Sequence, residues 1–237
     1  EETLFKPKPM ILVGEKPILA HIMQIFLLQG FTEFLIAKGY LGEQIDNWLA
    51  EYYEIQQNNS YIKKYFDPIS KMTITTVDTG LNSQTAGRIR KVFETIEDEK
   101  LLITYGDGLG NVNIKNLLSF HQKYNPLVTV TAVHPPARFG YLEIKRSGKV
   151  NKFGEKIQSN SGWINGGFFV VKRSVIEYIE HENQSFETHV LPHLTKMNQL
   201  RAFRHTGFWH PMDTVREKEL LEGYLNDDTP AWLLNLT

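Results

Sequence analysis

The sequence predicts an α/β fold, in which a mostly parallel, mixed central sheet carries helices on both faces and continues into a smaller α+β part. Three observations predict this class. Short apolar runs alternate with amphipathic stretches of helical period before residue 134. Glycine and proline mark the boundaries between the two kinds of segment. After residue 133, strand-like segments follow one another closely, which is typical of a mixed arrangement.

The elements of the first part follow from their periodicity. Residues 18–29 place apolar side chains at helical spacing, and Gly30 stands where a helix-ending glycine is expected. Residues 71–77 alternate and are rich in Thr, Ile and Val, which indicates a strand. Further helices are expected at 45–53, 87–96 and 114–124, and further strands at 34–37, 101–105 and 128–133.

The second part begins with a predicted β-hairpin, because residues 140–144 and 150–153 flank a short Arg-Ser-Gly-Lys turn. A strand is expected at 164–171, and helices are expected at 174–179, 189–198 and 216–225. The polar stretch 56–67 is expected to be a long mobile loop or a surface insertion. We expect one domain over residues 1–237, with residues 1–133 as one half and residues 134–237 as the other.

The composition limits the classes of function. The 237 residues contain no cysteine, so disulfides and thiolate zinc sites are excluded. The formal net charge of −1 gives no basic field for nucleic acid. No apolar run has the length of a membrane span, and no secretory signal is visible at the start. We therefore expect a cytoplasmic globular protein with neither nucleic-acid nor membrane partners.

Asp107 is the first candidate for a functional residue. It directly follows the apolar run 101–105 and is flanked by Gly106 and Gly108. Ligands of open α/β sheets bind at the carboxyl ends of the strands, where a carboxylate suits a hard cation such as Mg²⁺. The flanking glycines let phosphate approach the backbone closely. The same residues are equally compatible with a turn that needs Asp and Gly for conformational reasons alone.

Two further segments carry candidate charges. Asp213 and Thr214 precede the expected helix 216–225, so either residue can cap that helix or face a ligand. Lys6 and Lys8 alternate with prolines, which stiffen the run and give the two ammonium groups defined directions. Fixed ammonium groups suit a triphosphate, and a solvated basic turn is the alternative.

Small residues mark two more candidate segments. Residues 79–88 join a strand to a helix, where the backbone can approach a flat ring and the helix N-terminus favours anions. Gly166 and Gly167 interrupt the strand 164–171, where glycine often marks close approach of a ligand. Ordinary loops and bulges explain both segments equally well. The sequence contains no Walker glycine loop, no Gly-x-Ser-x-Gly elbow and no zinc metalloprotease pattern.

Several motif-bearing segments follow one another along the chain. They are residues 6–10 (KPKPM), 14–19 (GEKPIL), 77–80 (VDTG), 85–88 (TAGR), 104–108 (TYGDG), 135–140 (PPARFG), 153–156 (FGEK), 164–170 (INGGFFV) and 207–214 (GFWHPMDT). Together and in this order they resemble the sugar-nucleotide pyrophosphorylases, and among these the glucose-1-phosphate cytidylyltransferases. The resemblance spans almost the whole chain, and its specificity comes from the order of the segments.

The resemblance implies a Rossmann-like fold and a role for each matched residue. Asp107 and Asp213 match the two carboxylates that hold Mg²⁺, and Lys8 matches a lysine that contacts phosphate; these three are the implied catalytic residues. The implied nucleotide-binding residues are Lys6, Thr79, Gly80, Thr85, Ala86, Gly87, Arg88, Tyr105 and Gly106. The implied sugar-phosphate-binding residues are Gly140, Tyr141, Glu155, Lys156, Asn165, Gly166 and Trp209.

The resemblance also implies substrates and a mechanism. An oxygen of glucose 1-phosphate attacks the α-phosphorus of CTP in line, which gives CDP-glucose and pyrophosphate without a covalent intermediate. Residues 1–133 mainly bind the nucleotide, and residues 134–237 mainly bind the sugar phosphate. A homo-oligomer is expected, because aromatic side chains gather near residues 52–66.

The sequence departs from the family pattern in two places, and alternative functions remain. The family begins with a strand and a Gly-rich loop that cradles the triphosphate, so we expect residues upstream of Glu1, and others missing within 56–71. A pyrophosphorylase that uses dTTP or UTP, or a non-catalytic nucleotide-sugar-binding protein, remains an alternative. A glycosyltransferase is disfavoured, because the segment Asp107-Gly108-Leu109 lacks the Asp-x-Asp metal pair.

Overall fold

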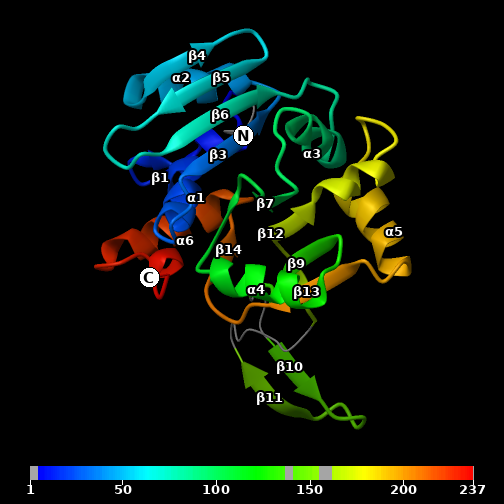
Figure 1. Ribbon diagram of the computed structural model, residues 1–237. Coiled ribbons are helices and arrows are strands. Elements are labelled where there is room, and N and C mark those ends of the chain that lie inside the picture. The colour runs from blue at the N-terminus through cyan, green and yellow to red at the C-terminus, as the bar shows by residue number, and fades with distance from the viewer. Residues whose placement is uncertain (1–4, 137–140, 155–161, 237) are drawn as a thin grey trace.

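Two four-stranded sheets form the centre of the molecule (Figure 1). The computed structural model describes residues 5–136, 141–154 and 162–236. The first sheet has the order β3 (Glu33–Lys38), β6 (Thr73–Asp78), β5 (Ile62–Phe66), β4 (Glu54–Asn58). The second has the order β13 (Leu200–Arg204), β9 (Val128–Val133), β12 (Ile164–Lys172), β7 (Lys100–Thr104). The second sheet therefore takes strands from both sides of residue 134.

The strand directions are mixed. The pairs β3–β6 and β9–β13 are parallel, whereas β12 runs antiparallel to both of its neighbours, and β5 runs antiparallel to β4 and β6. The expected α/β class with a mixed central sheet is thus confirmed. Its parallel share is smaller than the alternation of elements suggested, because β12 returns between two earlier strands.

Strand β12 shows why helices cover both faces of the second sheet. Its residues Phe168 and Val170 point into one core, and Phe169 and Val171 point into another, with at most 1% of each side chain exposed. A strand that is apolar at consecutive positions must be covered on both sides. The first core contains residues of α1 (Ile18–Leu27), α4 (Ile114–Tyr124) and α6 (Val215–Gly223), and the second contains residues of α3 (Thr85–Phe93) and α5 (Leu191–Lys196).

Helix α1 links the two sheets, because it has apolar residues on more than one side. Ile22 and Phe26 pack in the same core as Phe168 of the second sheet. Leu19 and Met23 pack instead with the helix α2 (Gly42–Tyr52) and with β5 and β6 of the first sheet. The predicted helix at 18–29 is confirmed, with its last turn ending before Gly30, which has a φ of 88°.

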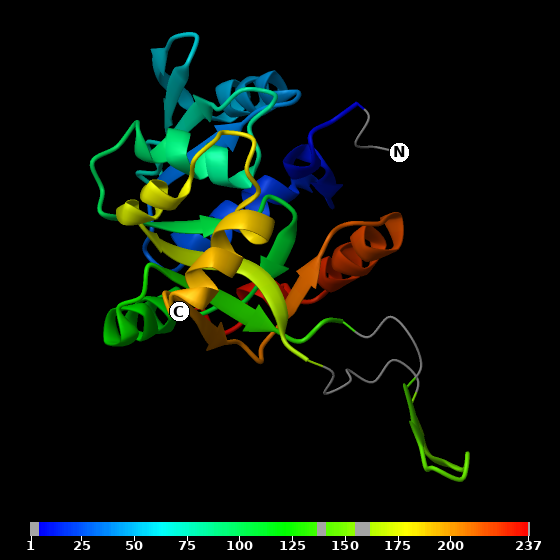
Figure 2. The ribbon, with the colours of Figure 1, turned by 90° about the vertical axis from the view of Figure 1, so that its right-hand side faces the viewer.

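Short strand pairs complete the fold. They are β1 (Leu12–Val13) with β2 (Lys16–Pro17), β8 (Gly108–Gly110) with β14 (Trp209–Pro211), and β10 (Tyr141–Ile144) with β11 (Val150–Gly154). The last pair is the predicted β-hairpin, and it projects away from the two central sheets (Figures 1 and 2). Single-turn helical segments occur at η2 (Lys8–Met10), η3 (Arg173–Tyr178), η4 (Phe186–Val190), η5 (Tyr224–Asn226) and η6 (Ala231–Leu233).

The stretch 56–67 differs from its prediction as a mobile loop or surface insertion. It contributes most of β4 and β5, which form an antiparallel pair that extends the first sheet. Every residue of β4 is exposed, so this strand lacks the apolar alternation by which a strand is recognised. Tyr65 of β5 is only 2% exposed and belongs to the core of its own chain.

Two predicted helices also differ in kind. The helix expected at 174–179 is instead the 3₁₀ segment η3 (Arg173–Tyr178), and the helix expected at 189–198 is divided into the π-helical turn η4 and the short helix α5. Pro192 lies in the first turn of α5, where a missing backbone N–H is tolerated. Among the described residues, no helix combines the length and the apolar character needed to cross a membrane.

Candidate active site

The backbone brings the carboxylates of Asp107 and Asp213 to one place. Asp107 lies between β7 and β8, and Asp213 lies between β14 and α6. Strands β8 and β14 pair antiparallel, with Pro211 opposite Gly108. The N–H of Met212 continues this pairing by donating to the Asp107 carbonyl at 2.7 Å. The two aspartates therefore leave adjacent ladder positions at the same end of the β8–β14 pair.

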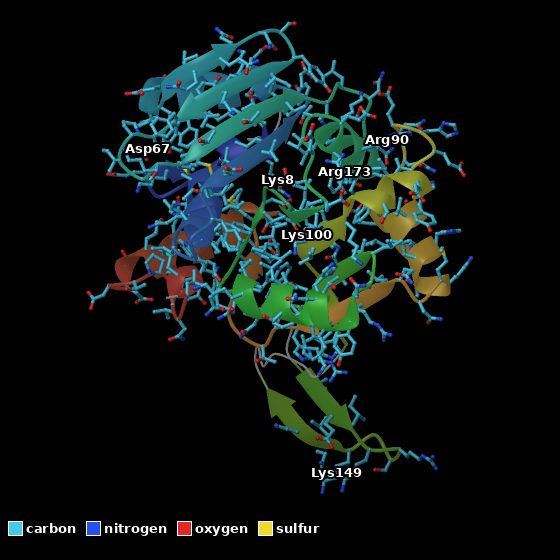
Figure 3. All side chains as sticks on the ribbon, in the orientation of Figure 1. Lys8, Asp67, Arg90, Lys100, Lys149 and Arg173 are labelled. Carbon is cyan, nitrogen blue, oxygen red and sulfur yellow. The ribbon has the colours of Figure 1, made fainter. Side chains whose placement is uncertain are left out.

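Lys8 bridges the two carboxylates from a third segment. Its Nζ donates to Oδ2 of Asp107 at 2.7 Å and to Oδ1 of Asp213 at 2.5 Å. The side chains of Lys8, Asp107 and Asp213 are 31%, 32% and 49% exposed, so the cluster is open to a ligand from solvent. Figure 3 places Lys8 at the centre of the molecule, between the two main sheets.

The approach of Lys8 depends on Pro9 and Gly106. The segment η2 begins after Pro7, and a Cβ added at Gly106 would lie only 2.6 Å from Cγ of Pro9. Glycine at position 106 thus lets the rigid Lys-Pro segment pack directly on the loop that carries Asp107. The hypothesis that the flanking glycines serve close approach agrees with this contact, although here the approaching group is a proline ring.

The electrostatics of the cluster keep Lys8 charged. Partial burial lowers the pKa of Lys8, but its hydrogen bonds to Asp107 and Asp213 and their charges outweigh burial and raise the pKa above its ordinary value. One ammonium group faces two carboxylates, so an additional cation is attracted to the same point. Two carboxylates aimed at one cationic atom form a set of oxygen ligands that a hard divalent ion can share.

The cap of α6 is provided by Thr214 and not by Asp213. The Thr214 hydroxyl accepts from the N–H of Glu217, whose carboxylate accepts from the Thr214 N–H in return, which completes a capping box. The capping alternative is therefore met by Thr214, and the ligand-facing role of Asp213 stays a prediction. Asp213 is free of the capping role, and its carboxylate bonds to Lys8.

The predicted nucleotide segment forms a tightly bonded loop at the end of β6. Thr79 is fully buried, and its hydroxyl donates to the Lys38 carbonyl at 2.9 Å while accepting from Arg88. The Thr79 carbonyl accepts from Lys91 Nζ at 2.9 Å. Gly80 has a φ of +81°, which lets the loop turn directly after Thr79. Thr79 and Arg88 are thus brought together, and both side chains are engaged within the protein.

The start of α3 is covered by a segment that the sequence did not single out. A Cβ on Gly87 would lie 2.0 Å from the Glu182 carbonyl, so only glycine fits there. Ala86 is fully buried, and its N–H donates to the Gln184 carbonyl at 3.1 Å. The hydroxyl of Thr85 donates to Glu187 at 2.7 Å. The small residues of this segment therefore serve close packing against residues 182–187.

The structure describes some of the residues that are predicted to bind the sugar phosphate. The exposed Asn165 donates from Nδ2 to the Tyr105 hydroxyl at 2.9 Å, and the Trp209 indole donates to the Gly166 carbonyl at 2.8 Å. Both contacts tie the bulged end of β12 to the segments that carry Asp107 and Asp213. Gly140, Glu155 and Lys156 lie outside the described residues, and for Tyr141 only the backbone strand is described.

Lys6 is not brought into the cluster. It is exposed, and within the described part of the chain no hydrogen bond or ion pair holds it beside Lys8. Glu187 and Lys91 are the residues that sequence reasoning missed. Glu187 contacts Tyr105 and Thr85, which lie far away in the sequence, and Lys91 donates to the carbonyl of Thr79; no local motif indicates these contacts.

Comparison with known protein families identifies the class of protein to which this fold and this three-residue cluster belong. Residues 3–227 match the family model described as nucleotidyl transferase. The chain belongs to this nucleotidyl transferase family.

Individual proteins give a more specific comparison than the family model. The chain is 40% identical over 239 residues to the glucose-1-phosphate cytidylyltransferase of Salmonella typhimurium, covering 98% of this chain and 93% of that protein. It is 39% identical to the glucose-1-phosphate cytidylyltransferase of Salmonella typhi, with the same coverage. Among solved structures, HddC from Yersinia pseudotuberculosis superposes with a TM-score of 0.69 at 21% identity, over 93% of this chain and 90% of that one, which supports the fold.

Proposed function

We propose that this nucleotidyltransferase transfers CMP from CTP to glucose 1-phosphate, releasing CDP-glucose and pyrophosphate. The observation that carries the proposal is the convergence of Asp107, Asp213 and Lys8 on one point, from three segments that are distant in sequence. The choice of CTP and glucose 1-phosphate is supported by the near full-length similarity to two glucose-1-phosphate cytidylyltransferases.

The donor set fits a divalent cation, which we propose to be Mg²⁺. Oxygens of Asp107 and Asp213 already flank one cationic nitrogen at 2.7 and 2.5 Å. Among the described residues no group of three or more acidic or histidine side chains gathers, so water and phosphate oxygens would supply the remaining ligands of such an ion. The ion would neutralise charge on the phosphates and help to orient them for in-line transfer.

Lys8 contributes to binding and charge neutralisation. An ammonium group has three hydrogens, and two of them point to Asp107 and Asp213. The third hydrogen is available to a phosphate oxygen. In the reaction, an oxygen of glucose 1-phosphate bonds to the α-phosphorus of CTP, and the bond from that phosphorus to the bridging oxygen breaks as pyrophosphate leaves. The attacking oxygen is already anionic, so Lys8 acts by lowering repulsion between the two substrates.

The remaining predicted site residues are assigned either to the nucleotide or to the sugar phosphate. We propose that the segments around Thr79, Gly80 and residues 85–88, together with Lys6, Tyr105 and Gly106, bind the nucleotide. The sugar phosphate is assigned to Asn165, Gly166 and Trp209, with Gly140, Tyr141, Glu155 and Lys156. A homo-oligomer remains a prediction, which sedimentation velocity of the purified protein tests directly.

The proposal is tested by a substrate panel. The full-length protein is incubated with Mg²⁺ and glucose 1-phosphate and, in turn, CTP, dTTP or UTP, and pyrophosphate release is measured. We expect kcat/KM with CTP to exceed the other values at least tenfold, a difference equivalent to about 1.4 kcal/mol of transition-state binding. A higher value with dTTP or UTP would overturn the base assignment, and no pyrophosphate with any nucleotide would overturn the catalytic proposal.

A further inference from the structure

Glu187 is the centre of a hydrogen-bond network next to the candidate active site. Its Oε1 accepts from the Tyr105 hydroxyl at 2.6 Å, and its Oε2 accepts from the hydroxyls of Thr85 at 2.7 Å and Ser185 at 2.9 Å. The residue lies in the π-helical turn η4, a conformation that is rare and found frequently at functional sites. Three hydroxyl groups from separate segments thus converge on one carboxylate.

The carboxylate is ionised at neutral pH. Partial burial raises the pKa of Glu187, but the hydrogen bonds from Tyr105, Thr85, the Glu187 N–H and Ser185 outweigh burial and lower the pKa below its ordinary value. Within the described residues no lysine or arginine forms an ion pair with Glu187. Hydroxyl donors, and not an opposite charge, therefore stabilise the anion.

An ionised carboxylate only accepts hydrogen bonds, and this fixes the direction of each bond around it. The Tyr105 hydroxyl must give its single hydrogen to Glu187, so its oxygen lone pairs are left to accept. The Nδ2 of Asn165 donates to that oxygen at 2.9 Å, and Oδ1 of Asn165 accepts from the Gly167 N–H at 2.9 Å. The Asn165 amide is held in one orientation, and among the described residues one Nδ2 hydrogen and one Oδ1 lone pair have no further partner.

The second carboxylate oxygen of Glu187, Oε2, holds the segment at the start of α3. The Thr85 hydroxyl donates to Oε2 and accepts from the Phe186 N–H at 2.7 Å, which locks the start of α3 to η4. The Tyr105 ring packs edge-on against Phe169, with a 5.7 Å separation of ring centroids, and occupies space that a Cβ on Gly167 would fill at 2.6 Å. Glu187 therefore connects Thr85, which is assigned to the nucleotide, with Asn165, which is assigned to the sugar phosphate, and the Tyr105 hydroxyl is the link.

We propose that Glu187 is a positioning residue that sets the relative placement of the two substrates. It acts through Thr85 on the nucleotide side and, through the hydroxyl of Tyr105, on Asn165 on the sugar-phosphate side. This inference rests on the proposed function for the roles of those segments. Glu187 itself need not touch either substrate, because all of its described contacts are to other side chains and to its own turn.

The kinetic test compares Glu187→Gln, Tyr105→Phe and the double variant. Glu187→Gln keeps the size of the side chain but removes the charge, so we expect KM for glucose 1-phosphate to rise about tenfold and KM for CTP to rise as well, from the loss of hydrogen bonds to a charged acceptor. Tyr105→Phe keeps the ring of this residue assigned to the nucleotide and removes only the hydroxyl that holds Asn165, so it is expected to raise mainly KM for glucose 1-phosphate. The double variant is expected to match Glu187→Gln, because both changes break one relay.

A purely structural role predicts a different result. Loss of folded protein lowers the apparent kcat and leaves each KM unchanged, so unchanged KM values in Glu187→Gln would overturn the proposal. Should that variant fail to fold, Tyr105→Phe alone decides, and an unchanged KM for glucose 1-phosphate overturns the relay. Glu177→Gln is the matched control, because Glu177 is an exposed glutamate on η3 and is expected to keep wild-type kinetics.

A substrate-free measurement separates this inference from the proposed function. The side-chain amide of Asn165 is identified in ¹H–¹⁵N spectra of the protein by its loss in Asn165→Asp. We expect this signal to shift in Glu187→Gln and in Tyr105→Phe, with no further shift in the double variant. An unmoved Asn165 signal in Glu187→Gln overturns the relay even if CTP is the substrate, and a shifted signal supports the relay even if CTP is not.

Discussion

The N–H of Met212 donates a 2.7 Å hydrogen bond to the carbonyl of Asp107, and this backbone contact places the two carboxylates of the candidate active site. The contact extends the β8–β14 ladder by one step beyond the pairing of Pro211 with Gly108. Because the frame is made of main chain, substitution of the side chain of Asp107, Asp213 or Lys8 changes the chemistry and leaves the frame in place.

The first prediction concerns Asp107, the carboxylate proposed to bind the metal. Asp107→Asn removes a negative charge from the point where the phosphates and the cation meet, and we expect turnover to fall about 10²-fold or more, in line with the loss of one preorganised electrostatic group. Steady-state pyrophosphate release at saturating Mg²⁺ measures this. Asp228→Asn, at an exposed position, serves as the control. Wild-type turnover in Asp107→Asn would show that the metal assignment is wrong.

Lys8 contacts the two carboxylates at which a divalent cation is proposed to bind, which gives a second prediction. Lys8→Met removes the ammonium group that lies between Asp107 and Asp213. With Mn²⁺ used in place of Mg²⁺, the nucleotide-free variant should bind the ion about tenfold more tightly than the wild type does. Turnover should nevertheless fall about 10²-fold, because the phosphates lose a charged donor. Calorimetric Mn²⁺ titration and steady-state kinetics measure the two effects. Equal Mn²⁺ affinity in Lys8→Met and in the exposed control Lys115→Met contradicts competition between Lys8 and the ion.

The packing of Pro9 on Gly106 leads to a third prediction. In Gly106→Ala the new Cβ would lie 2.6 Å from Cγ of Pro9, so the segment carrying Lys8 must move. We expect a loss of about 1–3 kcal/mol in the free energy of unfolding, as for other overpacked sites, together with at least tenfold lower turnover. Urea denaturation and kinetics test this. Gly223→Ala is the matched control, because nothing lies within 4 Å of its added Cβ; equal behaviour of the two variants refutes the packing argument.

Thr214 and Asp213 are neighbours with separable roles, and this gives a fourth prediction. Thr214→Ala removes the capping hydroxyl of α6 and should lower the free energy of unfolding by about 1 kcal/mol while most of the turnover is retained. Asp213→Asn should show the reverse: little loss of stability and a turnover reduced as in Asp107→Asn. Thermal unfolding and kinetics of both variants are compared. A Thr214→Ala protein that is fully stable but inactive would exchange the two assignments.

The fifth prediction concerns acid stability. Burial, together with the charges of Lys172 and Lys100, lowers the pKa of His121 from 6.5 to about 4, and the His121 side chain is paired with the Thr129 hydroxyl at 2.9 Å. The folded state thus favours neutral His121, so its contribution is fully present above pH 6.5 and is lost as the pH falls toward 4. At pH 5 the loss is roughly 2 kcal/mol, since 1.5 pH units below 6.5 correspond to that free energy.

This effect is measured as the difference in unfolding free energy between pH 7.5 and pH 5, for the wild type and for His121→Gln. The variant keeps a neutral polar group beside Thr129 and cannot titrate. Burial also lowers the pKa of His21 and His205, but both remain in the variant, so the difference between the two proteins isolates His121. Identical pH dependence in the two proteins would exclude His121 as the source.

Several elements could be predicted because local signals define their ends. Helix α4 and strand β9 have the predicted bounds. The Asn113 side chain caps the start of α4 by accepting from the Asn116 N–H, and Asn125 ends it in the left-handed region, with a φ of 51°. Strand β4 was missed because all of its residues are exposed and only Ile55 is apolar, so tertiary pairing with β5 and not hydrophobic alternation holds it in the sheet.

The candidate site was predictable to a different degree. Asp107, Asp213 and Lys8 were singled out from local residues, but their proximity followed only from the order of the motifs. The role of Glu187 could not be predicted, because its contacts reach Tyr105 and Thr85, which are 82 and 102 positions away. Residue spacing carries no signal for a hydroxyl that arrives from so distant a segment.

The long sequence separation within the cluster has a consequence for biosynthesis. Lys8 and Asp213 are 205 positions apart, and the backbone frame of the site needs strand β14. During synthesis on the ribosome, Lys8 and Asp107 emerge long before β14 is translated, so the nascent chain holds no complete site while most of its residues are already exposed. The backbone frame of the candidate site is therefore completed only when residues 209–213, near the end of the sequence, have been synthesised.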